Sequence, residues 1–197
     1  MTKLTLDDIV DARAYERERE EFRERVMALK RRRRIGIGPL VTVVFENRDT
    51  VRYQIQEMAR AERMLSDAAI QGELDVYNPL VPEPGELSAT LFLELTSPAA
   101  LREWLPKLVG IERAVAIRIG DAVIPARPED AHVQQLTREE ITSAVHYVQW
   151  SMTAPERRDF GTAPLVAVRI DHPSYRHETA LGEATRAELL RDLGGGA

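Results

Sequence analysis

Residues 41–65 read VTVVFENRDTVRYQIQEMARAERML, and the rest of the chain can be placed around this stretch. Residues 41–46 alternate between two faces and are rich in β-branched side chains, which predicts a strand. The polar residues 46–49 end the alternation, and Asn47 or Asp49 can cap the helix that follows. The apolar residues of that helix recur at helical spacing: Val51, Ile55, Met58 and Leu65.

Glu62 falls in the middle of this apolar stripe when residues are spaced at about 100°. A carboxylate there needs a cation, a metal or a proton, because burying an unpaired charge is costly. One interpretation places Glu62 in a polar pocket near the strand–turn–helix junction. The other is an ion pair with a nearby arginine, or a helix end that has already turned to solvent. The pocket candidates are Glu46, Arg48, Gln54, Glu57 and Glu62.

Composition bounds the class of protein. The chain has 197 residues, enough for one domain or two small ones. It has no cysteine, which excludes a disulfide framework, a thiol nucleophile and a cysteine-ligated cluster. No apolar run approaches the ~18 residues of a membrane helix, and no apolar segment follows a basic start. We therefore expect a cytoplasmic protein without a signal peptide or membrane contact.

Charge argues against general nucleic-acid binding, because 27 basic and 32 acidic residues give a net charge of −5. One basic run is the exception, and it could hold phosphate, nucleic acid or an acidic partner. Alternatively, these cations end a helix, where they complement its dipole, and Gly36 follows soon after. The run consists of Lys30, Arg31, Arg32, Arg33 and Arg34.

A long N-terminal helix is predicted from about Asp7 to Arg33. Its apolar positions form a narrow seam that Arg19 interrupts, and its other positions are heavily charged. The helix could pack along the sheet or along a copy of itself, so a homodimer is possible.

The C-terminal part contains two segments of similar sequence, which indicates a possible internal duplication. SATLFLEL at 88–95 matches SAVHYVQW at 143–150, and VAIRIGD at 115–121 matches VAVRIDH at 166–172. Each copy reads strand, helix, strand, with helices opening at Ser97-Pro98 and Thr153-Ala-Pro155. We predict one α+β domain over residues 1–197 with a mostly antiparallel sheet. It combines a helix-rich part (1–77) with two β-α-β-like halves sharing one sheet (87–193).

The histidines have different settings. His132 lies alone in a predicted loop, shortly before a capping box at Thr137–Glu140, and receives no role. His146 alternates with apolar residues, so we expect a hydrogen-bonded histidine in the core. The alternative is that His146 is a ligand. His172, His177 and Glu178 have the donor types of an open metal site, although their spacing matches no standard motif.

Several stretches together resemble the bacterial domain-of-unknown-function 3501 family (DUF3501). They are LTLDDIVDARAYERERE, LKRRRRIGIGP, VTVVFENRDTVRYQIQEMARAER, YNPLVP, LSATLFLEL and VAVRIDHPSY. The resemblance implies a neighbourhood of rubrerythrin-like proteins and iron–sulfur oxidoreductases, hence oxidative stress or electron transfer. It assigns no catalytic residue, no cofactor and no activity.

Three functional hypotheses follow. The first is a non-catalytic accessory protein that binds a redox partner through residues 30–34 and the long charged helix. The second is a metal- or small-molecule-binding enzyme with a Glu/Arg/His pocket. The third is a phosphate or nucleic-acid binder that uses the basic run, which the acidic net charge disfavours.

Overall fold

The strand, turn and helix expected around residue 47 are present in the computed structural model, which describes residues 2–129 and 141–194. Strand β2 spans Val41–Glu46 and helix α2 spans Arg48–Ala61. The Asn47 side chain accepts a hydrogen bond from the Thr50 amide, and the Thr50 hydroxyl accepts one from the Asn47 amide. This reciprocal capping box selects Asn47 rather than Asp49 as the residue that starts the helix.

The other described elements are helices, short 3₁₀ turns and strands. The helices are α1 (Ala12–Arg33), α3 (Asp67–Tyr77), α4 (Pro98–Trp104), α6 (Ala154–Thr162) and α7 (Glu183–Asp192), with short 3₁₀ turns η1 (Leu6–Asp8), η2 (Asn78–Leu80) and η3 (Ile111–Arg113). The strands are β1 (Arg34–Ile37), β3 (Glu86–Leu93), β4 (Val115–Ile119), β5 (Ala122–Pro125), β6 (Arg127–Pro128), β7 (Val145–Ser151), β8 (Val166–His172) and β9 (Tyr175–Ala180).

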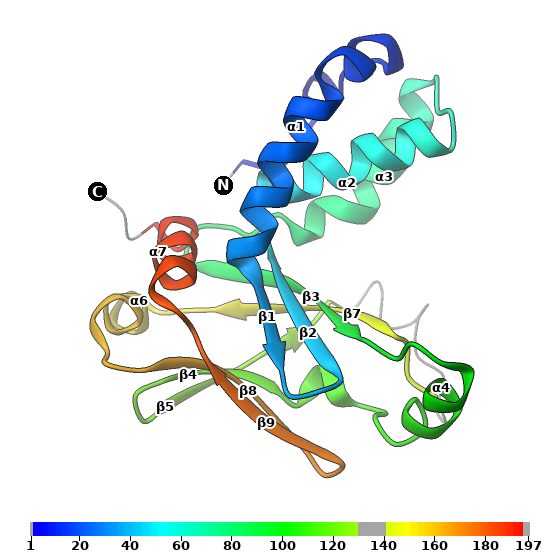
Figure 1. Cartoon of the computed structure of the whole chain (residues 1–197). Coiled ribbons are helices and arrows are strands. Elements are labelled where there is room, and N and C mark those ends of the chain that lie inside the picture. The colour runs from blue at the N-terminus through cyan, green and yellow to red at the C-terminus, as the bar shows by residue number, and fades with distance from the viewer. Residues whose placement is uncertain (1, 130–140, 195–197) are drawn as a thin grey trace.

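These strands form two antiparallel sheets, in the orders β1-β2-β3-β7-β6 and β5-β4-β8-β9 (Figure 1). The main core contains apolar side chains of both sheets, such as Phe45 and Trp150 from the first and Ile117 and Val168 from the second. The fold class is therefore α+β with antiparallel sheets, as predicted. The pairing of β2 with β3 joins the N-terminal hairpin to the C-terminal part within one sheet.

The two halves of the predicted repeat do not share a single sheet. Strands β3 and β7 pair in the first sheet, whereas β4 and β8 pair in the second. Each half therefore contributes one strand to each sheet and crosses between the sheets through α4 or α6 (Figure 1). The prediction of one shared sheet was wrong, because similar strand patterns say that a strand is half buried without saying which sheet it joins.

Helix α1 begins five residues later than predicted, at Ala12 rather than Asp7. The Asp11 carboxylate accepts hydrogen bonds from the amides of Arg13 and Ala14, both at 2.9 Å, and so caps the helix. Upstream, Thr5 and Asp8 form a capping box of their own around the short turn η1. The sequence thus contains two successive start signals, and the second one opens the long helix.

Of the two interpretations of Glu62, the inward-facing carboxylate is wrong and the helix end that has turned to solvent is confirmed. Helix α2 ends at Ala61, so Glu62 is its C-terminal cap and its side chain is exposed. Leu65, the last member of the predicted stripe, is 88% exposed. Val51 and Ile55 are buried as predicted. The helical spacing therefore holds only as far as the helix itself continues.

Helices α1, α2 and α3 cover the face of the first sheet that points away from the second sheet (Figure 1). All six residues of β2 are consequently buried, although only alternate ones face the main core. Buried residues of the α1 seam, Tyr15, Phe22 and Val26, pack with Tyr53 of α2. Residues of the same chain therefore cover the apolar seam of α1. Glu46, at the end of β2, lies beneath the helical layer and is buried.

Replacing Glu57 with glutamine is expected to weaken the contact between α1 and α2 and to flatten the acid dependence of stability. Arg19, which interrupts the apolar seam, holds the Glu57 carboxylate with two bonds of 2.8 Å, and the Tyr15 hydroxyl donates a third at 2.7 Å. The Arg19 hydrogen bond and, secondarily, the Tyr15 hydroxyl hold the pKa of Glu57 below its ordinary value of 4.5, against the raising effect of burial.

A carboxyl whose pKa is lowered by folding stabilises the protein above its unfolded pKa and ceases to do so as pH falls through its folded pKa. We expect Glu57→Gln to cost about 1 kcal/mol at neutral pH, since the pair is about a quarter exposed. The wild type should also lose more stability below pH 4.5 than the variant. Urea unfolding across that range measures both. Glu16→Gln, which breaks the more exposed bridge to Arg60 between the same helices, is the control. Equal acid slopes for wild type and Glu57→Gln would contradict the prediction.

Two expectations, His132 and the capping box at 137–140, lie outside the described residues. None of the described helices combines the length and apolar character needed to cross a membrane.

Candidate ligand-binding pocket

A pocket of about 230 Å³ lies between the helical layer and the outer face of the first sheet. Two of the predicted pocket residues, Glu46 and Gln54, line it together. The other lining side chains come from α1, α2, the α3–η2 segment, β3 and β7: Lys30, Val51, Tyr77, Leu80, Thr90, Phe92, Val145 and Tyr147. Five separate segments of the chain therefore meet at this site.

Glu46 is the buried acid of the pocket, with 8% of its surface exposed. One carboxylate oxygen accepts a hydrogen bond of 2.7 Å from the Thr90 hydroxyl, and the other accepts one of 2.5 Å from the Thr50 hydroxyl. Within residues 2–129 and 141–194, no Lys, Arg or His forms an ion pair with it. A carboxylate can accept about four hydrogen bonds, so Glu46 retains acceptor capacity.

The local sequence explains why this carboxylate is fixed. Glu46 ends β2, and the Thr50 that holds it is the residue that completes the capping box of α2. Thr90 lies on β3 two residues beyond Ser88, the direct partner of Glu46, so it is a diagonal neighbour on the same face of the sheet. The turn and the sheet register together hold the acid.

The basic run is divided between the pocket and the contact with α7. Lys30 lines the pocket and its ammonium lies 6.0 Å from the centre of the Tyr53 ring. Arg33 is 1% exposed and forms ion pairs with Asp192 and Glu188, while Arg32 also contacts Glu188 and Arg34 contacts Glu94. Arg31 is exposed. Residues 30–33 form the last turn of α1, which favours the helix-end interpretation of the run.

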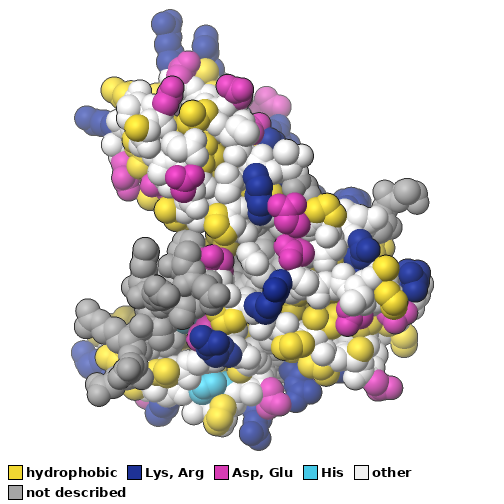
Figure 2. Space-filling model, turned by 180° about the vertical axis from the view of Figure 1, so that it is seen from behind, with side chains coloured by type: hydrophobic (Ala, Val, Ile, Leu, Met, Phe, Trp, Pro, Cys, Tyr) yellow, Lys and Arg dark blue, Asp and Glu magenta, His cyan; other side chains and the backbone are white. Residues whose placement is uncertain are grey.

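Charges of both signs also mix elsewhere on the surface. On the face shown in Figure 2, Lys and Arg side chains are interspersed with Asp and Glu side chains and do not gather over one element. The described residues on this face therefore form no broad basic patch of the kind that tracks a nucleic-acid backbone.

Two tyrosines and an amide complete the polar lining. Burial, with smaller contributions from Tyr77 and Glu46, raises the pKa of Tyr147 to about 12. Burial also raises the pKa of Tyr77, followed by the charge of Glu73, while Gln54 acts in the opposite direction. Both phenols therefore stay protonated at neutral pH and present hydroxyl groups rather than charges.

The remaining pocket candidates lie elsewhere. Glu57 faces α1 and is held by Arg19, and Arg48 forms an ion pair with Asp8 at 2.6 Å. Glu62 is exposed at the end of α2. The polar residues near the strand–turn–helix junction therefore do not meet in one pocket, because successive side chains of a helix point in different directions.

The three predicted metal donors do not converge. His172 is buried near the β8–β9 turn, where its Nε2 lies 3.1 Å from the Val109 carbonyl oxygen. His177 stacks on Tyr175, whereas its neighbour Glu178 binds Arg118. Adjacent residues of a strand point to opposite faces, so His177 and Glu178 cannot share an ion. The described part of the chain holds no group of three or more His, Asp or Glu residues suited to a metal.

His146 is a core histidine, as predicted. It is buried, and its Nε2 lies 2.9 Å from both the Thr142 hydroxyl and the Ser143 carbonyl oxygen. Burial lowers its pKa, although the charge of Glu112 acts in the opposite direction. The Glu112 carboxylate, 3.9 Å from Nδ1, is buried too, which no pattern in the sequence indicates.

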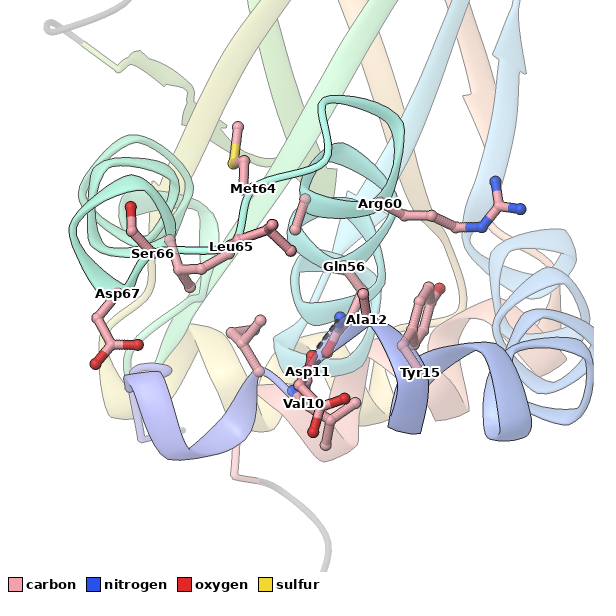
Figure 3. Close-up of a pocket in the computed structure, with 13 residues that line it drawn as sticks. Val10, Asp11, Ala12, Tyr15, Gln56, Arg60, Met64, Leu65, Ser66 and Asp67 are labelled. Atoms are coloured by element: carbon pink, nitrogen blue, oxygen red, sulfur yellow. Dashed lines mark hydrogen bonds between the residues drawn. The ribbon is translucent and has the colours of Figure 1, made fainter.

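A second hollow, of about 160 Å³, lies between the start of α1, the end of α2 and the start of α3 (Figure 3). Most of its polar side chains have structural partners. The Gln56 amide exchanges two hydrogen bonds with the Val10 backbone, while Asp11 and Ser66 cap α1 and α3. Arg60 binds Glu16 and Tyr15 binds Glu57. Because these groups hold the helices together, this hollow is a weaker candidate for ligand binding.

Sequence reasoning missed most of the lining of the main pocket. Thr90 and Tyr147 lie on the outer face of β3 and β7, directly opposite each other in the register. The alternation of residues 88–95 and 143–150 could have placed them on a common face. What it could not show is that a helical layer would cover that face.

The fold and the pocket define a class: an α+β protein in which a helical layer closes a small, mixed polar and apolar pocket against an antiparallel sheet. The chain belongs to the family described as Protein of unknown function (DUF3501), whose model matches residues 3–193. The resemblance seen in the sequence is thereby confirmed.

A solved structure supports the same placement. The chain is similar to the crystal structure of a novel protein of unknown function from Burkholderia pseudomallei K96243. The two share 34% identity with a TM-score of 0.88, over 98% of this chain and 100% of that one. No curated protein of known role matches the chain.

Proposed function

We propose that this protein is a non-catalytic binding protein that takes a small molecule into the pocket between the helices and the first sheet. The observation that carries the proposal is Glu46, a buried carboxylate that borders a cavity and is held by two threonine hydroxyls without an ion pair among the described residues. Removing a carboxylate from water costs several kcal/mol unless a partner compensates. A bound ligand would supply that partner.

The lining supports binding rather than catalysis. Among the described residues the lining includes no histidine, and the Thr90 hydroxyl serves to hold the Glu46 carboxylate together with Thr50. The mixture of apolar side chains with a few placed polar groups is typical of ligand pockets.

The binding test uses a variant that fills the pocket. Val145 lines it, is half-buried, and points from the sheet toward the helices, so Val145→Trp should exclude ligands without cutting into the main core. Val123→Trp, at a 47% exposed position of the edge strand β5, is the matched control. Both variants are screened by thermal shift against a panel of amino acids, polyamines, organic acids and nucleosides.

We expect at least one panel member to raise the melting temperature of the wild type and of Val123→Trp, but not of Val145→Trp, because ligand binding to the folded state stabilises it by mass action. Shifts that are equal in all three proteins, or absent from the wild type, would count against the pocket as a binding site.

We also propose that the binding protein acts as an accessory to a redox system, with a rubrerythrin-like protein or an iron–sulfur oxidoreductase as partner. The support is the resemblance set out above, together with the absence of cysteine, which prevents the chain from ligating such a cluster with thiolates. Because Arg32, Arg33 and Arg34 are engaged within the chain, residues 30–34 do not offer five free charges to that partner. Recovery of neither protein class with the native chain from its own lysate would argue against this role.

A further inference from the structure

The pocket contains one acid and one base that do not pair with each other. Glu46 and Lys30 both line it, yet no ion pair joins them. Within the described ranges, Lys30 makes no ion pair, and its ammonium lies over the Tyr53 ring at 6.0 Å from the ring centre. The two charged groups therefore line the same pocket without forming an ion pair with each other.

Nearby groups do not neutralise Glu46. The Arg33 guanidinium approaches its backbone oxygen at 3.5 Å, but its charge is taken by Asp192 and Glu188. Arg48, two residues away, is paired with Asp8. The N-terminus of α2 contributes a favourable dipole. Its effect is smaller than the cost of burying a carboxylate.

The pocket also has an apolar wall. Val51, Leu80, Phe92 and Val145 contribute it, and the protonated phenols of Tyr77 and Tyr147 border it. Such a surface removes the aliphatic or aromatic groups of a ligand from water. Each methylene that the ligand buries there strengthens its binding. The site thus offers an anion, a cation and an apolar surface within one small volume.

We propose that the ligand is a zwitterion with an apolar body, of the class of aliphatic or small aromatic α-amino acids, bound with its ammonium on Glu46 and its carboxylate on Lys30. This inference rests on the proposed binding function and deepens it. An ammonium can donate to the acceptor positions of Glu46 that Thr50 and Thr90 leave open. The ligand carboxylate would form an ion pair with the Lys30 ammonium. Both the buried Glu46 and the half-buried Lys30 would then have a partner of opposite charge.

Other ligand classes fit less well. A phosphate or a nucleotide would bring negative charge close to Glu46, and a purely cationic amine would leave Lys30 unpaired and add a second positive charge beside it. A fatty or organic acid would leave Glu46 uncompensated. Only a molecule carrying both signs matches both sides of the pocket.

The test compares three ligands that differ only in charge. L-leucine carries both groups, isopentylamine lacks the carboxylate and isocaproate lacks the ammonium. Calorimetric titration of the full chain should show leucine binding at least about tenfold more tightly than either analogue, since each charged hydrogen bond contributes appreciably. L-methionine and L-phenylalanine extend the comparison to other side-chain shapes.

The variants assign each charge to a residue. Glu46→Gln should weaken leucine binding about tenfold or more without weakening isocaproate, and Lys30→Met should weaken leucine without weakening isopentylamine. Glu62→Gln, at the exposed C-terminal cap of α2, and Arg31→Met, at an exposed position of α1, are the matched controls and should change nothing.

The outcomes separate this inference from the proposed function. If no amino acid binds but another panel member stabilises the wild type and not Val145→Trp, the zwitterion is wrong and the binding function stands. If isopentylamine binds as tightly as leucine, the site recognises a cation alone and the role of Lys30 is overturned. If nothing binds in a Val145-dependent way, both proposals fail.

Discussion

Replacing Arg33 with methionine is expected to lower the free energy of unfolding by about 3–5 kcal/mol, because it leaves the buried Asp192 carboxylate without its cation and removes the buried one of the cations that pair with Glu188. The Arg33 side chain is 1% exposed and lies between α1 and α7, where it contacts Asp192 at 2.6 Å and Glu188 at 3.2 Å. These partners lie 159 and 155 residues further along the chain. Guanidinium unfolding monitored by tryptophan fluorescence measures the change.

Arg31→Met is the control for this experiment, since Arg31 is exposed in the same helical turn. Its effect should stay within about 0.5 kcal/mol. Combining Arg33→Met with Asp192→Asn and Glu188→Gln should recover part of the loss, because the uncompensated charges are then removed. A loss below about 1 kcal/mol for Arg33→Met alone would show that the network does not hold the C-terminal helix.

The second large effect is expected at Gly38, in the turn between β1 and β2. Its φ of +67° is in the left-handed region, and a Cβ built there would lie 2.5 Å from the His177 ring and 2.6 Å from the Tyr175 hydroxyl. Tyr175 ties this turn to the second sheet: its hydroxyl donates to the Ile37 carbonyl oxygen at 2.6 Å and accepts from the Leu40 amide at 3.0 Å.

Gly38→Ala should therefore cost about 2–4 kcal/mol, the sum of left-handed backbone strain and overpacking. Gly36→Ala is a matched control two residues away, where a Cβ would meet nothing within 4 Å and φ is not positive. Urea unfolding of both variants gives the comparison. If the two variants had equal stability, the turn would not be anchored on β9 as described.

The sequence correctly indicated the local structure of several elements. The alternation in residues 41–46, the proline-initiated helices α4 and α6 and the caps at Asn47 and Thr153 are all observed. These features depend on backbone groups within a few residues, so local rules suffice. The family was also identified correctly, and the core position of His146 followed from strand alternation.

Errors arose where an element met the rest of the molecule. Glu62 was placed on a buried stripe, because the helical period was continued one residue past the end of α2. The repeated strands were placed in one sheet, although β3 and β4 belong to different sheets. His172, His177 and Glu178 were grouped by proximity in sequence, whereas strand geometry sends the last two to opposite faces.

For the candidate pocket, too, the sequence indicated single residues but not which residues lie together in space. The sequence named Glu46 and Gln54, because polar residues at a strand–helix junction stand out from an apolar pattern. It did not connect them to Thr90, Tyr77 or Tyr147, nor did it separate Lys30 from the arginines that follow it. Those relations join residues that are tens of positions apart.

By itself, the sequence determined the fold class, the family and the position of most helices and strands, since short-range periodicity and capping encode them. The tertiary structure alone decided that a helical layer buries the second face of β2, that Arg33 is paired with α7 while Lys30 faces a cavity, and that Glu46 rather than Glu62 is the buried acid. The physical reason is that burial and charge compensation depend on which segments, distant in the sequence, pack against each other. The local pattern of residue types does not specify that packing.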